Sequence, residues 1–129
     1  MEIMYLIDTN IFLEILLSQK QKDICKEFLL SNIKHIYISD FSLHSIGVIL
    51  FRNNKEKVFN KFVEDIIQKI KILTLSEELY SDLGEVKEEF GLDFDDAYQF
   101  KIAEEYGLSI VTQDKDFEKV SAKIEITFL

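Results

Sequence analysis

The feature that most constrains the fold is an abrupt change of pattern near the start of the chain. The apolar run Met4 to Ile7 stops at Asp8-Thr9-Asn10, and a second apolar run, Ile11 to Leu17, follows it. The first run is continuous and partly β-branched, as in a strand buried on both faces, whereas the second has apolar residues at helical spacing. The junction therefore predicts a strand, a turn and a helix, with Asn10 as the helix N-cap.

Asp8 is the first candidate functional residue. A carboxylate at the end of a buried strand, just before a helix opens, lies in the crevice where open α/β sheets bind ligands. The alternative interpretation is structural, because Asp8 is a second candidate for the N-cap of the same helix.

The rest of the chain alternates between the two patterns. Polar or glycine residues separate the segments: Asp40 and Asp93 are expected to cap helices, and Gly91 and Gly107 to end them. We expect further strands at 35–39, 72–75, 108–112 and 124–128, helices at 24–30, 41–51, 58–70, 76–90 and 94–106, and a helical turn at 117–120. The helix at 41–51 is strongly apolar, which predicts burial on most sides.

Strands that alternate with helices predict an α/β fold. We expect a single domain over 1–129, a three-layer αβα sandwich with a mostly parallel five-stranded sheet. In such a sheet the carboxyl ends of the strands share one edge, so Asp8, Asp40, Thr112 and Asp114 should meet there.

Asp95 and Asp96 open the helix that leads into the strand at 108–112. On topology alone they belong to the opposite edge, unless that helix begins across the top of the sheet.

Composition limits the functions that the chain can have. With 15 basic and 24 acidic residues the net charge is −9, which argues against binding nucleic acid by bulk charge. It is compatible with a metal site, because each pair of carboxylates about 4 Å apart costs roughly 4 kcal/mol at an effective dielectric near 20, and a divalent cation removes that cost. The chain has no membrane-length apolar run and no export signal, so we expect a cytoplasmic protein with no membrane partner.

Three short motifs together resemble a PIN domain, most closely a VapC-type toxin. They are Asp8-Thr9-Asn10, Asp96-Ala97 and Val111-Thr112-Gln113-Asp114. The resemblance implies a Mg²⁺- or Mn²⁺-dependent endoribonuclease that hydrolyses RNA phosphodiester bonds. It also implies the toxin of a type II toxin–antitoxin pair, whose partners would be RNA, a small antitoxin protein and, in a homodimer, a second copy of the chain.

The resemblance also assigns roles to residues. It makes Asp8, Asp96 and Asp114 the catalytic acids that hold the metal, with Asp116 as a nearby auxiliary. We expect Thr9, Asn10, Thr112 and Asp95 to orient or surround these carboxylates.

One position departs from the family pattern. The family usually has a Glu early in the helix after the second strand, and His44 occupies that place here. Asp40 and His44 are four residues apart and share a helix face, so either could contact the metal or its water. The departure leaves an alternative function open: a PIN-like fold with weakened or lost catalysis that binds RNA or a protein.

Overall fold

A five-stranded parallel sheet forms the centre of the protein. The computed structural model describes residues 2–129. The strands are β1 (Tyr5–Ile7), β2 (Ile36–Ser39), β3 (Lys71–Leu73), β4 (Ser109–Thr112) and β5 (Ile126–Phe128), in the order β3-β2-β1-β4-β5. Every neighbouring pair is parallel. The predicted α/β class is confirmed, and the sheet is parallel throughout.

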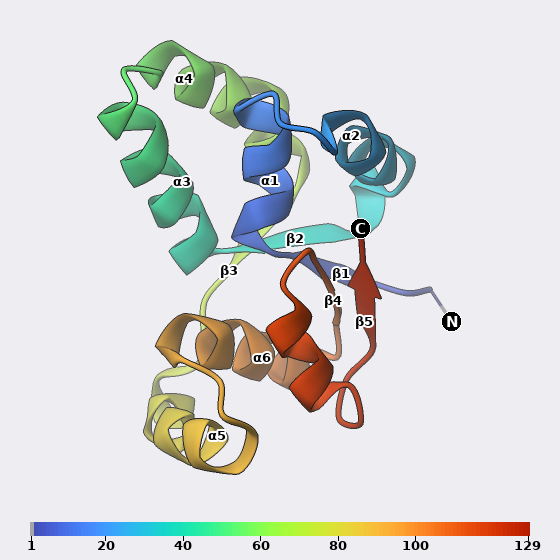
Figure 1. Cartoon of the computed structure of the whole chain (residues 1–129), viewed down its shortest axis with the longest axis vertical. Helices are drawn as coiled ribbons and strands as arrows, with labels where there is room; N and C mark the ends of the chain where they lie inside the picture. The colour runs from blue at the N-terminus through green and yellow to red at the C-terminus, as the bar shows by residue number, and fades with distance from the viewer. Residues whose placement is uncertain (1) are drawn as a thin grey trace.

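Helices cover both faces of the sheet, which gives the predicted three-layer sandwich. α1 to α4 lie on one side, and α5 and α6 lie on the other (Figure 1). Their bounds are α1 Thr9–Leu16, α2 Lys22–Ser31, α3 Asp40–Arg52, α4 Glu56–Asp65, α5 Leu83–Phe90 and α6 Phe94–Tyr106. Short 3₁₀ helices span Ile33–His35, Ile67–Lys69, Glu77–Asp82 and Lys115–Val120.

Alternate residues of the central strands point into two separate cores. Ile7 and Val111 pack with α1 to α4, whereas Leu6 and Ile110 pack with α5 and α6. All four side chains are at most 1% exposed. The continuous apolar run at 4–7 thus contains a strand buried on both faces, as predicted, and β4 is also buried along its whole length.

Two glycines end helices on the second face, as the sequence predicts. Gly91 follows α5 with φ 73° and Gly107 follows α6 with φ 68°, both in the left-handed region that glycine adopts without strain. Between them, the Asp93 side chain accepts a hydrogen bond from the Asp96 amide at 2.9 Å and caps α6. These signals fix the start of α6, which carries one of the candidate acids.

Two predicted caps are wrong by one or two residues. α1 begins at Thr9, so its N-cap is Asp8 and not Asn10. Likewise the N-cap of α3 is Ser39, whose hydroxyl accepts from the Ser42 amide, and Asp40 is the first helical residue.

The helices at 41–51 and 58–70 also differ from expectation. In α3 only Ser42, Ile46 and Leu50 are buried, most other residues are half-buried, and His44, Phe51 and Arg52 are exposed, so this helix is not buried on most sides. α4 ends at Asp65, and a 3₁₀ turn leads into β3 at Lys71. In residues 2–129 no helix has the length and apolarity needed to cross a membrane.

Candidate metal and catalytic site

The candidate site lies at the carboxyl edge of the sheet, beside its two central strands. Asp8 follows β1 and Asp114 follows β4, and these strands are neighbours. The Asp8 amide donates to the Val111 carbonyl at 2.9 Å, which continues the ladder up to the site. The parallel pairing therefore brings the first and last motifs together.

Asp8 is held in one orientation by three hydrogen bonds. Its carboxylate accepts from the Thr9 amide at 2.8 Å, the Thr112 hydroxyl at 2.7 Å and the Gln99 side-chain amide at 3.3 Å. Only 7% of the residue is exposed, and this burial raises the pKa of the carboxyl despite the three donors. The negative charge of Asp114 raises it further.

Asp96 reaches the same edge from the first turn of α6. Asp96, Asp114 and Asp116 each have a carboxylate oxygen within 4.8 Å of the others. Burial, followed by the charges of Asp93, Asp114, Asp8 and Asp116, raises the pKa of Asp96 to about 7. The topological expectation that Asp96 starts at the opposite edge is wrong, because a helix that leads into a parallel strand runs antiparallel to it and begins at the carboxyl edge.

A cavity of about 370 Å³ joins these acids. Its polar lining consists of Asp8, Thr9, Asn10, Ser45, Asp93, Asp95, Asp96 and Asp114. Asp116 lies outside the lining but within reach of Asp96 and Asp114. We call this space the acidic cavity.

Little positive charge balances the acidic cavity. Across residues 2–129, Asp8, Asp96 and Asp114 form no ion pair with a Lys, Arg or His side chain, and Asp116 has only Lys119 at 3.8 Å. Several carboxylate oxygens that repel one another fit the donor set that Mg²⁺ and Mn²⁺ prefer. The residues therefore suit a divalent cation.

The structure places His44 and Asp40 away from these acids, contrary to expectation. Neither lines the acidic cavity: His44 is exposed, and Asp40 accepts a hydrogen bond from the Tyr98 hydroxyl at 2.7 Å. The residue of α3 that lines the acidic cavity with a polar group is Ser45. Phe41 and Ile49 lie one turn before and after Ser45 and also line the cavity, so they complete this face of the helix.

The residues expected to surround the acids have different partners. Thr112 contacts Asp8 directly, and its oxygen also accepts from the Asp114 amide at 2.9 Å. Thr9 donates to the Ser42 hydroxyl at 2.8 Å, whereas the Asn10 side chain accepts from the Gln113 amide at 3.2 Å. Asp95 lines the acidic cavity, and burial raises the pKa of its carboxyl.

Sequence reasoning missed Gln99, which is 1% exposed. Its amide nitrogen donates to Asp8 and, at 2.7 Å, to the Ser42 hydroxyl, and within the described chain its carbonyl oxygen has no hydrogen-bond partner. Gln99 lies three residues after Asp96, on the same face of α6. That spacing was the available signal: a polar residue one turn beyond a site acid.

Comparisons with known proteins agree with this geometry. The PIN domain family model matches residues 5–123. Similar solved structures include a toxin–antitoxin complex from Klebsiella pneumoniae, with 22% identity, TM-score 0.72 and coverage of 88% of this chain and 89% of that one. VapBC2 from Rickettsia felis, bound to a DNA fragment from its promoter, shares 17% identity with TM-score 0.79 and 98% coverage of both chains.

A third similar structure is VapC20 from Mycobacterium tuberculosis, described as a Sarcin-Ricin loop cleaving toxin. It shares 15% identity with TM-score 0.77 and coverage of 93% of this chain and 95% of that one. At these identities the structures establish the fold alone. The search of curated proteins finds no match to the sequence. Because the family model spans nearly the whole chain, the protein belongs to the PIN domain family.

Proposed function

We propose that the protein is a metal-dependent endoribonuclease that hydrolyses RNA phosphodiester bonds, acting in the cytoplasm as the toxin of a type II toxin–antitoxin pair. The observation that carries the proposal is the meeting of Asp8, Asp96 and Asp114 at one sheet edge, with no ion-pair partner for these three in residues 2–129. Membership of the PIN family and the toxin–antitoxin proteins among the similar structures support it.

Asp8, Asp96 and Asp114 would hold the cation, with Asp116 close enough to assist. When bound, Mg²⁺ or Mn²⁺ supplies Lewis-acid activation of water and neutralises charge on the phosphate. Thr112 and Gln99 keep the Asp8 carboxylate aimed at the acidic cavity. Because the pKa of Asp96 is raised to about 7, a cation at this site would compete with a proton for the Asp96 carboxylate.

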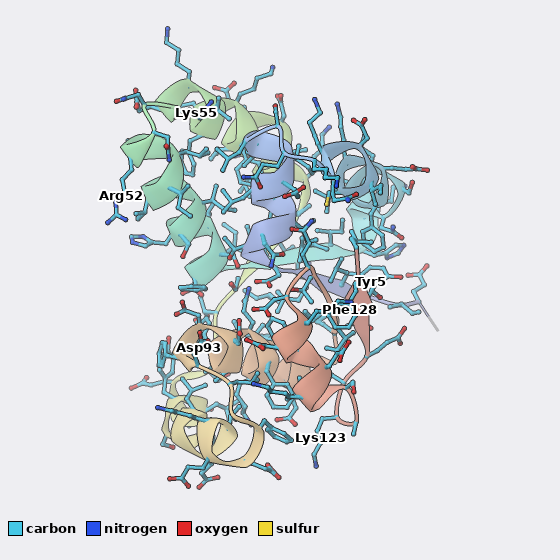
Figure 2. All side chains as sticks on the ribbon, viewed as in Figure 1. Tyr5, Arg52, Lys55, Asp93, Lys123 and Phe128 are labelled. Carbon is cyan, nitrogen blue, oxygen red and sulfur yellow. The ribbon has the colours of Figure 1, made fainter. Side chains whose placement is uncertain are left out.

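RNA must approach a protein of net charge −9 along local basic groups. Figure 2 shows Arg52 and Lys55 near the turn between α3 and α4, whereas Asp93 marks the start of α6. α3 has 13 residues and is therefore about 20 Å long, which separates this basic corner from the carboxyl edge of the sheet. We propose that Arg52, Lys55 and Lys57 contact RNA phosphates several nucleotides from the cleaved bond.

The complexes among the similar structures suggest the protein partner. The Klebsiella pneumoniae structure is a toxin–antitoxin complex and the Rickettsia felis structure is VapBC2. We therefore propose a small antitoxin as the partner of this chain, with a homodimer as the toxin's own assembly.

One observation favours a second function, the binding module without strong catalysis. The family resemblance predicts an acid from the helix after β2. The face of α3 that lines the acidic cavity instead consists of Phe41, Ser45 and Ile49. The cation would then have fewer carboxylates than the family usually supplies. Such a protein would still bind RNA or a partner while cleaving slowly.

Titration of Mn²⁺ by calorimetry, together with cleavage of a labelled single-stranded RNA, separates the two functions. We expect the wild type to bind Mn²⁺ and cleave, and Asp8→Asn to lose both. Asp23→Asn, which removes an exposed acid from the first turn of α2, is the matched control and should keep both. A wild-type protein that binds RNA, does not bind Mn²⁺ and does not cleave RNA would establish the binding module instead.

A further inference from the structure

A second cavity, of about 430 Å³, opens beside the acidic one and is mostly aromatic. It lies between α3, α6 and the 3₁₀ helix Glu77–Asp82. Its lining residues are Asp40, Phe41, His44, Tyr80, Phe94 and Tyr98. We call it the aromatic cavity.

The rings of the aromatic cavity are held in place but remain open to solvent. Phe94 is 61% exposed and stacks on Tyr98, with centroids 6.5 Å apart and planes at 24°; Tyr80 is 47% exposed and meets Tyr98 edge-on at 5.8 Å. Tyr98 itself is buried and anchored, since its hydroxyl donates to Asp40 and accepts from the Leu75 amide at 3.2 Å. Two exposed rings on a fixed base form a preorganised stacking surface.

The aromatic cavity adjoins the acidic cavity directly. Phe41 lines both of them, and Phe94 lies in sequence between Asp93 and Asp95, which line the acidic cavity. A nucleotide chain with one phosphate beside the acids would therefore bring a neighbouring base to the rings.

We propose that the aromatic cavity binds one unpaired base of the RNA substrate, next to the phosphate that is cleaved. This inference rests on the proposed ribonuclease function and names a position that selects the substrate. Bases of single-stranded RNA stack on exposed aromatic side chains and expose their hydrogen-bonding edges to polar groups. The base is neutral, so the acidic surroundings do not repel it, while the cation neutralises the adjoining phosphate.

Asp40 gives the aromatic cavity a preference among bases. One of its carboxylate oxygens accepts from Tyr98, and the other has no hydrogen bond within residues 2–129. A carboxylate accepts from base N–H groups, and guanine presents two adjacent donors on its Watson–Crick edge, whereas uracil presents one beside two acceptors. The position therefore selects guanine over uracil.

A second copy of the chain is the less favoured occupant. In a two-fold contact the same patch meets itself. Phe94 is flanked by Asp93 and Asp95, and Tyr80 follows Glu77 and Glu78, so such a contact would bring acids against acids. A base, which brings no negative charge of its own, fits this rim better.

The test compares Phe94→Ala with Tyr106→Ala, since Tyr106 is also an exposed ring, 45%, at the other end of α6 and outside both the acidic and the aromatic cavity. The substrates are a short oligouridylate with one central guanosine and the same strand without it. We expect Phe94→Ala to raise KM for the guanosine strand roughly 5- to 150-fold, the effect of losing one base stack, with kcat and Mn²⁺ affinity unchanged. Phe94→Tyr should restore KM, and Tyr106→Ala should leave it at the wild-type value.

Asp40→Asn tests the choice of base. We expect it to remove most of the wild-type preference for the guanosine strand, which for a bidentate contact is about 5- to 150-fold. Equal cleavage of both strands by the wild type would overturn this selection.

Failure of the proposed function is distinguishable from failure of this inference. If the wild type cleaves but Phe94→Ala matches it, the inference is wrong and the nuclease function stands. If the wild type does not cleave, fluorescence anisotropy with the same strands decides: weaker binding by Phe94→Ala supports the base site, and unchanged binding overturns it. Sedimentation in which Phe94→Ala converts a dimer to a monomer would assign the cavity to self-association and also overturn the inference.

Discussion

Asp96→Asn should stabilise the protein when no metal is present. The pKa of Asp96 rises from 3.8 to about 7, and a shift of about three units corresponds to roughly 4 kcal/mol if it acts wholly on folding. Asp96 is only half-buried, so solvent screening reduces this to about 1–2 kcal/mol. At about 4 °C per kcal/mol for a domain of this size, thermal melting in EDTA above pH 7 should show a rise of about 4–8 °C.

The pH dependence of this gain has a defined sign. The pKa of Asp96 is higher in the folded protein than in the unfolded chain. The destabilising effect of the ionised carboxylate therefore reaches its full size above about pH 7. As the pH falls from 7 towards 4, the folded protein takes up the proton and the penalty disappears. The difference in melting temperature between Asp96→Asn and wild type should therefore close over this range.

Metal should reverse the order of the two proteins. A ligand that binds only the folded state adds about 2.7 kcal/mol at a concentration 100 times its Kd. Saturating Mn²⁺ should thus raise the melting temperature of the wild type above that of Asp96→Asn. The control Asp23→Asn should follow the wild type within about 0.5 kcal/mol throughout.

Two results would refute this reasoning. A lower melting temperature for Asp96→Asn in EDTA would mean that the carboxylate stabilises the fold, as an ordinary acid in the first turn of a helix does. An equal Mn²⁺-induced rise in the melting temperature of both proteins would show that Asp96 does not bind the metal.

Three further predictions use the same melting and calorimetric measurements. Ser45→Glu should add a carboxylate to the acidic cavity, which raises Mn²⁺ affinity and lowers the melting temperature of the metal-free protein. His44→Glu, on the exposed face of α3, should change neither quantity. Equal effects of the two substitutions would contradict the orientation of α3. Gln99→Glu should lower the free energy of unfolding of the metal-free protein by roughly 1–3 kcal/mol, and its melting temperature with it, because a donor to Asp8 is replaced with a second buried carboxyl. Gly91→Ala, at φ 73°, should cost about 1 kcal/mol in any metal condition, and an unchanged melt would show that the helix end relaxes.

The sequence predicts those parts of the fold that depend on local signals. The short apolar run at 4–7 favours a strand buried on both faces, the β-branched pattern at 108–112 favours a second strand, and Gly91, Asp93 and Gly107 set the limits of two helices. From these elements the parallel sheet follows, and it places Asp8 and Asp114 at one edge. The structure adds that β1 and β4 are neighbours, which brings the two acids close together. The observed N-caps, Asp8 and Ser39, differ from the predicted Asn10 and Asp40 because adjacent polar residues compete for the same role and packing decides between them.

The position of Asp96 follows from the direction of α6 and not from its place in the chain before β4. A helix between two parallel strands must return to the starting edge of the sheet, so it begins at the carboxyl edge and ends at the amino edge. The first turn of α6 therefore had to lie on the same side as Asp8. The spacing of Gln99 from Asp96 indicates only a shared helix face. Its hydrogen bonds to Asp8 and Ser42 do not follow from the sequence, since they depend on how α6 and α3 rotate about their axes.

The rotation of α3 explains why His44 and Asp40 lie away from the acids and what the site contains instead. The helix is oriented by its buried stripe of Ser42, Ile46 and Leu50. His44 precedes Ile46 by two residues, about 200° around the helix, and so lies nearly opposite the stripe. Ser45 precedes Ile46 by one residue, about 100° around, and faces the acidic cavity. The donors available to a cation thus come from the sheet edge and α6, and none of the carboxylates comes from α3.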